Sequence, residues 1–126
     1  MNTLLWICQA YLAGHSLFSG ISKSIFSEKK LVYEMKQTGV EGLPLPLIRF
    51  IGMSQLVIAP GLILPWLLNI FPILTPVASF AFGIDVTMAT GIHIQRREYK
   101  TAAATLFTAL VGFFVAAGRF SFLNIL

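Results

Sequence analysis

Four strongly polar side chains lie inside long apolar segments, where their chemistry would be unusual: His15, Gln55, Asp85 and Arg119. If these segments are membrane helices, a rise of about 1.5 Å per residue places His15, Gln55 and Asp85 about 12–16 Å from the end that carries the basic residues. Thr108 falls at a similar level. An imidazole, an amide and a carboxyl group at one depth could line a pocket or relay a proton, because a polar residue inside a span needs a partner or a role.

A structural interpretation of the same residues is also open. Three polar side chains on different helices can form a hydrogen-bonded cluster that fixes how the helices pack. Glutamine is a poor acid–base catalyst, and Asp85 is the only carboxylate inside the apolar segments. We therefore predict a polar core at His15, Gln55, Asp85, Thr108 and Arg119, and we assign no catalytic residue.

The sequence contains no recognisable metal or catalytic motif. His15 and His93 have no ligand partner at the spacing of a metal site, and the single Cys8 excludes an internal disulfide and a cysteine-based metal site. The chain has no GxSxG, P-loop or GxGxxG pattern. We expect no metal, and any redox chemistry would depend on a bound cofactor or a partner.

The elements that must position these residues are four apolar segments, predicted as helices over 3–26, 47–64, 73–95 and 101–123. Apolar residues make up 56% of the 126-residue chain and charged residues 11%, which is far from the composition of a soluble domain. The length suffices for four spans of about 20 residues. We therefore expect a single all-α domain over 1–126, an integral membrane bundle of four helices. Residues 1–26 lack the basic start of a signal peptide, so we expect them to be a retained helix.

The basic residues predict the orientation of this bundle. Eight of the nine lie in or beside the stretches 23–49 and 95–101: Lys23, Lys29, Lys30, Lys36, Arg49, Arg96, Arg97 and Lys100. Four crossings put all eight on one side, and Lys and Arg favour the cytoplasmic side. We expect a multi-pass protein of the bacterial inner membrane with both termini extracytoplasmic.

Several residues are predicted to lie at the membrane interface. Lys29, Lys30, Arg96 and Arg97 would meet anionic headgroups rather than nucleic acid, since they flank membrane-length segments instead of forming a basic face. Trp6 and Trp66 would be aromatic anchors at the opposite interface. Arg119, about one turn from the outer end of its helix, would reach the interface by snorkelling. It could also meet Gln9 or an anionic ligand.

Four segments together resemble the DoxX-like family of small bacterial four-helix membrane proteins. They are LFSGISK (17–23), RFIGMSQLVIAPGLILP (49–65), GIHIQRRE (91–98) and AAGRF (116–120), which follow the order of the family pattern along nearly the whole chain. The resemblance implies the four-helix membrane fold. The namesake of the family is linked with a membrane thiosulfate:quinone oxidoreductase, and relatives occur beside redox or stress systems, although most members have no established activity.

Two positions depart from the family pattern. Members commonly carry a Glu where this chain has Gln55, whereas Asp85 occupies a position that is usually apolar. The change places any inherited proton or quinone chemistry in question. Asp85 could compensate from the facing helix, which predicts a Gln55–Asp85 pair.

These observations leave three functional hypotheses. The first is a non-enzymatic accessory or partner-binding membrane component. The second is a subunit of a membrane redox complex that binds a quinone or another lipophilic molecule near His15, Gln55 and Asp85. The third is a conductor of protons or small solutes. The expected partners are the lipid bilayer and either another membrane or redox protein or a second copy of the chain. The sequence requires no cofactor, and a quinone is the candidate it suggests.

Overall fold

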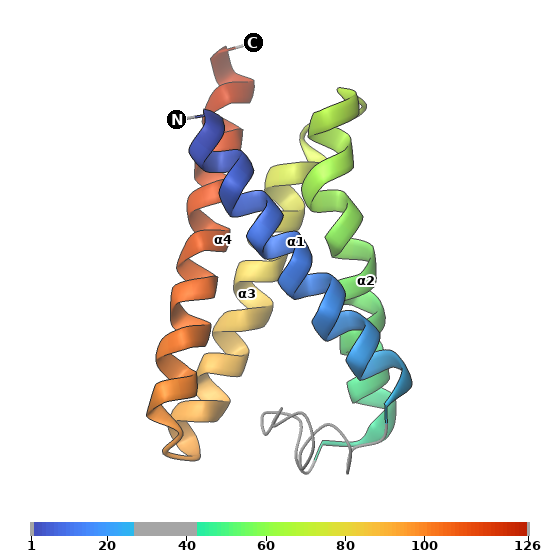
Figure 1. Cartoon of the computed structure of the whole chain (residues 1–126), viewed down its shortest axis with the longest axis vertical. Helices are drawn as coiled ribbons and strands as arrows, with labels where there is room; N and C mark the ends of the chain where they lie inside the picture. The colour runs from blue at the N-terminus through green and yellow to red at the C-terminus, as the bar shows by residue number, and fades with distance from the viewer. Residues whose placement is uncertain (1, 27–42, 126) are drawn as a thin grey trace.

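The computed structural model describes residues 2–26 and 43–125, with side chains as far as Ser121. They form four helices: α1 (Asn2–Ile25), α2 (Leu45–Leu68), α3 (Leu74–Gln95) and α4 (Tyr99–Ile125). The four helices stand roughly along one axis, and both termini lie at the same end of the bundle (Figure 1). The predicted all-α four-helix architecture is confirmed.

The helix α2 extends beyond its predicted end at Leu64 and continues through Pro65 to Leu68. Proline lacks the N–H group that would bond to the carbonyl four residues earlier, which here is that of Gly61. Thr75 of α3 donates its hydroxyl to the Gly61 carbonyl at 3.1 Å instead. The helix ends at Asn69, whose left-handed conformation (φ 54°) lets the chain turn toward α3.

All four helices present large apolar side chains outward. Ile7, Val57, Met88 and Phe107, one from each helix, are between 61% and 74% exposed. Each helix is also long and apolar enough to cross a bilayer. An apolar surface of this extent suits contact with lipid and not with water, so the fold is that of a multi-pass membrane protein.

The helices pack as two hairpins, α1 with α2 and α3 with α4, joined mainly through α2 and α3. The helix α1 runs obliquely across the bundle, beginning beside α4 at the end that carries the termini and finishing beside α2 at the other end (Figure 1). The two hairpins are joined by one buried apolar core, which consists of Leu5, Leu12, Leu62, Phe82, Val86, Ala109 and Val115. Because α1 leaves α4 along its course, the two hairpins separate toward the end opposite the termini.

Glycines permit the close crossing of α1 and α2. A Cβ atom added to Gly20 would lie 2.9 Å from the carbonyl oxygen of Gly52 and from the backbone nitrogen of Leu56. A Cβ on Gly52 would lie 2.8 Å from backbone atoms of Lys23 and Ser24. Small residues that allow backbones to touch are a common basis of helix association in membranes, where the hydrophobic effect does not drive helices together.

We predict that Gly20→Leu destabilises the bundle by about 2–3 kcal/mol, because the new side chain must displace the backbone of α2. Gly14→Leu on the same helix is the matched control, since nothing lies within 4 Å of a Cβ at that position. The measurement is the thermal denaturation midpoint of each variant in detergent. Equal losses in the two variants would show that the α1–α2 crossing is not close.

Candidate functional site

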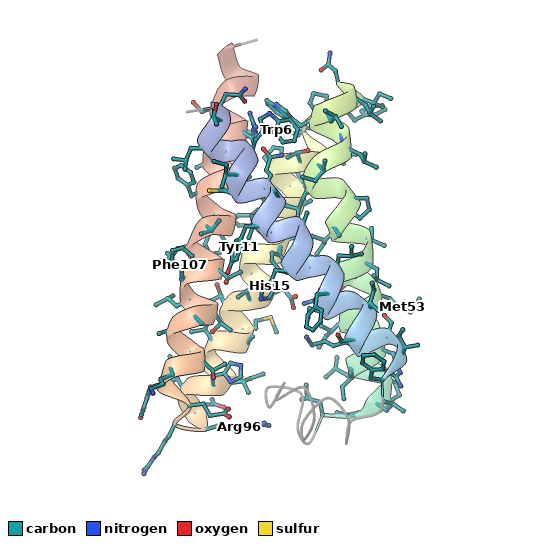
Figure 2. The ribbon with its side chains drawn as sticks, in the orientation of Figure 1. Trp6, Tyr11, His15, Met53, Arg96 and Phe107 are labelled. Carbon is teal, nitrogen blue, oxygen red and sulfur yellow. The ribbon has the colours of Figure 1, made fainter. Side chains whose placement is uncertain are left out.

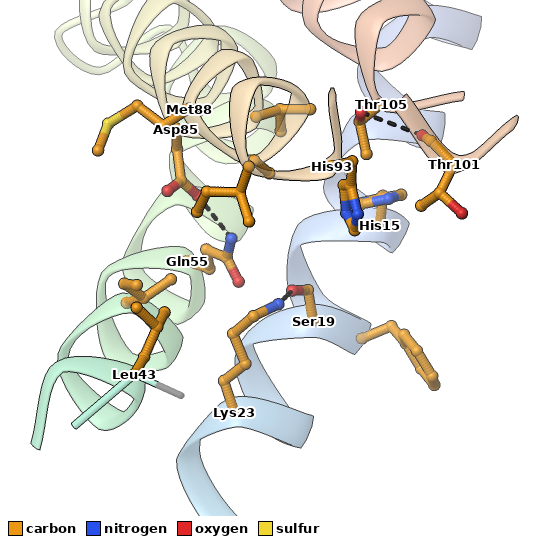
Figure 3. A pocket seen from close by; sticks show the side chains of 15 residues that line it. His15, Ser19, Lys23, Leu43, Gln55, Asp85, Met88, His93, Thr101 and Thr105 are labelled. Carbon is orange, nitrogen blue, oxygen red and sulfur yellow. Dashed lines mark hydrogen bonds between the residues drawn. The ribbon is translucent and has the colours of Figure 1, made fainter. Parts of the chain in front are cut away.

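A cavity of about 280 Å³ lies where the two hairpins separate, at the end opposite the termini. Its walls include the second half of α1, the first half of α2, the second half of α3 and the start of α4. Figure 3 shows the side chains that line it. The polar ones are His15, Ser19, Lys23, Gln55, Asp85, His93, Thr101 and Thr105. Apolar side chains, among them Phe18, Ile51, Met88 and Ile92, complete the lining.

The structure brings three of the predicted polar residues, His15, Gln55 and Asp85, to this one cavity. The Gln55 amide nitrogen donates a hydrogen bond of 2.6 Å to Oδ2 of Asp85, so the predicted pair between α2 and α3 is present. The ring of His15 packs edge-on against Phe82, with centroids 5.7 Å apart. The helical spacing was sufficient to place them at one level because all three helices are regular there.

The backbone around Gln55 is also fixed. Ser16 of α1 is buried and donates its hydroxyl to the Gln55 carbonyl at 2.7 Å. That bond attaches this turn of α2 to α1, one turn from the Gly20–Gly52 crossing. The backbone from which the Gln55 side chain extends is therefore held in place at the wall of the cavity.

Lys23 is a cavity residue that the sequence did not predict. The sequence analysis counted it only among the basic residues that predict the orientation. Its ammonium group lies beside the cavity and donates to the hydroxyl of Ser19, one helical turn earlier (Figure 3). The position of Ser19 four residues before Lys23 is a sequence signal that could have suggested this orientation, because residues i and i+4 share a helix face.

His93 is the second such residue. It is 6% exposed, and its Nδ1 atom lies 3.0 Å from Oε1 of Glu98 in the turn before α4. Nearby, Thr90 of α3 donates to Thr105 of α4 at 2.8 Å. These contacts join α3 to α4 along the cavity wall.

Thr108 does not reach the cavity. Its hydroxyl shares a hydrogen bond of 2.7 Å with the phenol of Tyr11, which ties α4 to α1. In Figure 2, Tyr11 and His15 lie at successive levels of α1, with Phe107 of α4 near Tyr11. Thr108 therefore belongs to a helix contact between the core and the cavity.

Arg119 lies near the opposite end of the bundle and is only 1% exposed. Its Nε donates to the Gln9 side-chain oxygen at 2.6 Å, and its Nη1 donates to that of Asn2 at 2.7 Å. Gln9 in turn donates to the Leu62 carbonyl at 2.7 Å. The prediction that Arg119 snorkels to the interface is wrong, whereas the predicted contact with Gln9 is confirmed. The amide oxygens supply inside the bundle the polar contacts that the interface would have offered.

The two tryptophans flank this arginine. The guanidinium carbon of Arg119 lies 5.2 Å from the ring centroid of Trp6 and 4.7 Å from that of Trp66, distances typical of cation–π contacts. Trp6 and Trp66 were predicted as interface anchors, and this contact with Arg119 is an additional feature that the sequence did not indicate. We call Arg119, Gln9, Asn2, Trp6 and Trp66 the arginine cluster.

The predicted basic anchors lie at the cavity end or outside the described residues. Arg96 and Arg97 are exposed in the turn between α3 and α4 (Figure 2 labels Arg96). Lys29 and Lys30 lie outside the described residues. Arg49 bonds to the carbonyls of Lys23 and Phe26 at 2.9 and 2.6 Å, so its charge caps the end of α1.

Comparison with known families decides the relationship of this chain. A family model of the DoxX-like family matches residues 7–118. The chain belongs to the DoxX-like family. No curated protein and no solved structure matches it. In this DoxX-like protein the matched range includes every cavity residue, whereas it ends one residue before Arg119 and begins after Asn2 and Trp6.

We predict that Arg119→Lys weakens the DoxX-like bundle by about 2–3 kcal/mol, since a lysine cannot donate to Gln9 and Asn2 together while stacking on the indoles. The readouts are the thermal midpoint and the tryptophan emission, because both tryptophans of the chain flank Arg119. Arg97→Lys, in the exposed turn, is the control and should change neither. An unchanged emission spectrum in Arg119→Lys would contradict the indole contacts.

Proposed function

We propose that this DoxX-like protein is a non-enzymatic membrane component that binds a lipophilic small molecule in the cavity between its two hairpins. The observation that carries the proposal is the lining: apolar walls that surround a small set of polar groups, at the end of a membrane bundle where the two hairpins separate. Small-molecule sites usually have this composition, with a few polar groups that orient the ligand.

The size and openness of the cavity support a ligand with a compact head and an apolar tail. A volume of about 280 Å³ has room for a ring-sized head. Because the cavity is not closed, a tail attached to that head can extend out of it. A quinone has this construction in both redox states. His15 and the N–H groups of Lys23 that Ser19 does not use could donate to the carbonyl oxygens of the oxidised form, and the hydroxyl groups of the reduced form could donate to an acceptor in the lining.

The contacts among the polar residues favour binding over catalysis. Gln55 is bonded to Asp85, Lys23 to Ser19 and His93 to Glu98, so these groups hold one another in place. We propose that any chemistry on the bound molecule is performed by a partner, a membrane or redox protein for which this chain is an accessory subunit. The alternative, a conductor of protons or small solutes, is less well supported. Within the described residues, the apolar core, which includes Leu12 and Phe82, separates the cavity from the arginine cluster and itself offers no polar path between them.

We further propose that the protein lies in the bacterial inner membrane with the cavity end toward the cytoplasm and both termini outside. The end opposite the termini carries five of the basic residues that the structure describes: Lys23, Arg49, Arg96, Arg97 and Lys100 (Figure 1). This distribution supports the orientation through the preference of Lys and Arg for the cytoplasmic side.

The orientation can be tested with single cysteines in a Cys8→Ser background. Ile70→Cys, in the exposed turn at the end of the termini, should react with a membrane-impermeant thiol reagent in intact spheroplasts. Lys100→Cys, at the cavity end, should react only after the membrane is permeabilised. The reverse pattern would exclude the proposed orientation.

The binding proposal predicts that a decyl-tailed benzoquinone binds the detergent-solubilised protein saturably and that filling the cavity prevents this. Ala89→Phe adds a ring at the cavity wall and should weaken binding at least 10-fold, measured by equilibrium dialysis. Ala81→Phe on the same helix is the matched control, since Ala81 is exposed and is not part of the lining. Unsaturable partitioning, or equal binding by both variants, would overturn the proposal.

A further inference from the structure

We propose that the cavity selects ligands whose polar head donates a hydrogen bond, that is, lipophilic molecules that carry a hydroxyl group. This inference rests on the proposed binding function and names the chemistry of its ligand. It is carried by one atom, the side-chain oxygen of Gln55. That oxygen is a buried hydrogen-bond acceptor at the cavity wall.

The contact with Asp85 fixes which end of the Gln55 amide faces the cavity. The nitrogen donates to Oδ2 of Asp85 at 2.6 Å, and the oxygen must then lie on the other side of the planar amide. The reverse orientation would set the amide oxygen against a carboxyl oxygen, with two acceptors in contact. Figure 3 shows the Gln55 oxygen directed away from Asp85, toward the space bordered by Ser19 and the Lys23 ammonium.

This oxygen is buried and has no hydrogen-bond partner among residues 2–26 and 43–125. Gln55 as a whole is only 5% exposed. A buried acceptor without a donor is unfavourable, and more so where surrounding lipid replaces water. A ligand that brings a donor to this oxygen would remove the penalty, whereas a ligand with acceptors alone would leave it in place.

The surrounding contacts keep the acceptor in position before a ligand arrives. Ser16 fixes the Gln55 backbone through its carbonyl, and Asp85 fixes the amide through its nitrogen. Lys23, a cationic side chain of the lining, donates to Ser19 and makes no hydrogen bond to this oxygen. A phenol, a hydroquinone or a fatty alcohol presents the required O–H, whereas the corresponding ether or ketone has no proton to donate.

The test compares 4-nonylphenol with 4-nonylanisole, which share the ring and the tail and differ in the hydroxyl proton. Binding to the full chain in detergent is measured by equilibrium dialysis, and 1-undecanol serves as a third probe that separates ring hydroxyls from aliphatic ones. We expect the phenol to bind at least 10-fold more tightly than the anisole. In Gln55→Met the ratio should fall to near 1, whereas in Thr108→Val, outside the cavity, it should stay as in the wild type.

The outcomes separate this inference from the proposed function. Equal, saturable binding of phenol and anisole to the wild type overturns the inference and leaves the binding function standing, whereas saturable binding of none of the probes overturns both. A preference that persists in Gln55→Met assigns the acceptor to another residue and also overturns the inference. Should Gln55→Met fail to fold, Asp85→Leu serves instead: without its partner the amide can rotate, so the preference should decrease, and an undiminished ratio would count against the proposal.

Discussion

Lipid offers no hydrogen bonds, and this constraint governs every polar contact in the structure. Donors and acceptors inside the bundle therefore bond to other helices or to their own backbone, and the Gln55 side-chain oxygen at the cavity wall is an exception. The Gly61 carbonyl, left without its usual donor by Pro65, accepts from Thr75. Arg119 bonds to Gln9 and Asn2, and Gln55 to Asp85. These bonds join helices that the hydrophobic effect, which is absent between apolar surfaces in lipid, cannot hold together.

The same constraint explains why two separate polar sites exist. The arginine cluster and the cavity occupy opposite halves of the bundle, with the apolar core between them. At the first site α1, α2 and α4 are brought together around one charge. At the second the helices diverge and a space remains. The cavity is thus a consequence of the oblique path of α1, whose start is held beside α4 and whose end is held beside α2 by Gly20, Gly52 and Arg49.

Much of the fold could be predicted from the sequence, because apolar segments of membrane length have few alternatives to the helix. The level shared by His15, Gln55 and Asp85 followed from helical rise alone, and the Gln55–Asp85 pair followed from the exchange of residue types relative to the family. The extension of α2 to Leu68 could not be predicted, since it depends on a hydroxyl from Thr75 on another helix. The family match, over residues 7–118, agrees with the resemblance seen in four segments.

The directions of long side chains were the least predictable feature. Lys23 and Arg119 both lie near helix ends, where long basic side chains commonly extend to the interface. The structure turns Lys23 along α1 to Ser19 and Arg119 inward to Gln9. The choice depends on which acceptors neighbouring helices present, and this is a property of the three-dimensional packing rather than of the segment itself. Thr108 is a buried polar residue as predicted, but its partner Tyr11 could not be predicted because it lies on a distant part of the chain.

The arginine cluster has a mechanical consequence. It ties α1 to α4 through Gln9 and Asn2, and to α2 through the Leu62 carbonyl, all within the first three turns of α1. The remaining turns of α1 are attached chiefly to α2. Because the Gln55–Asp85 bond joins α2 to α3 at the cavity, a rotation of the α1–α2 hairpin about the arginine would have to break that bond before it could change the width of the cavity.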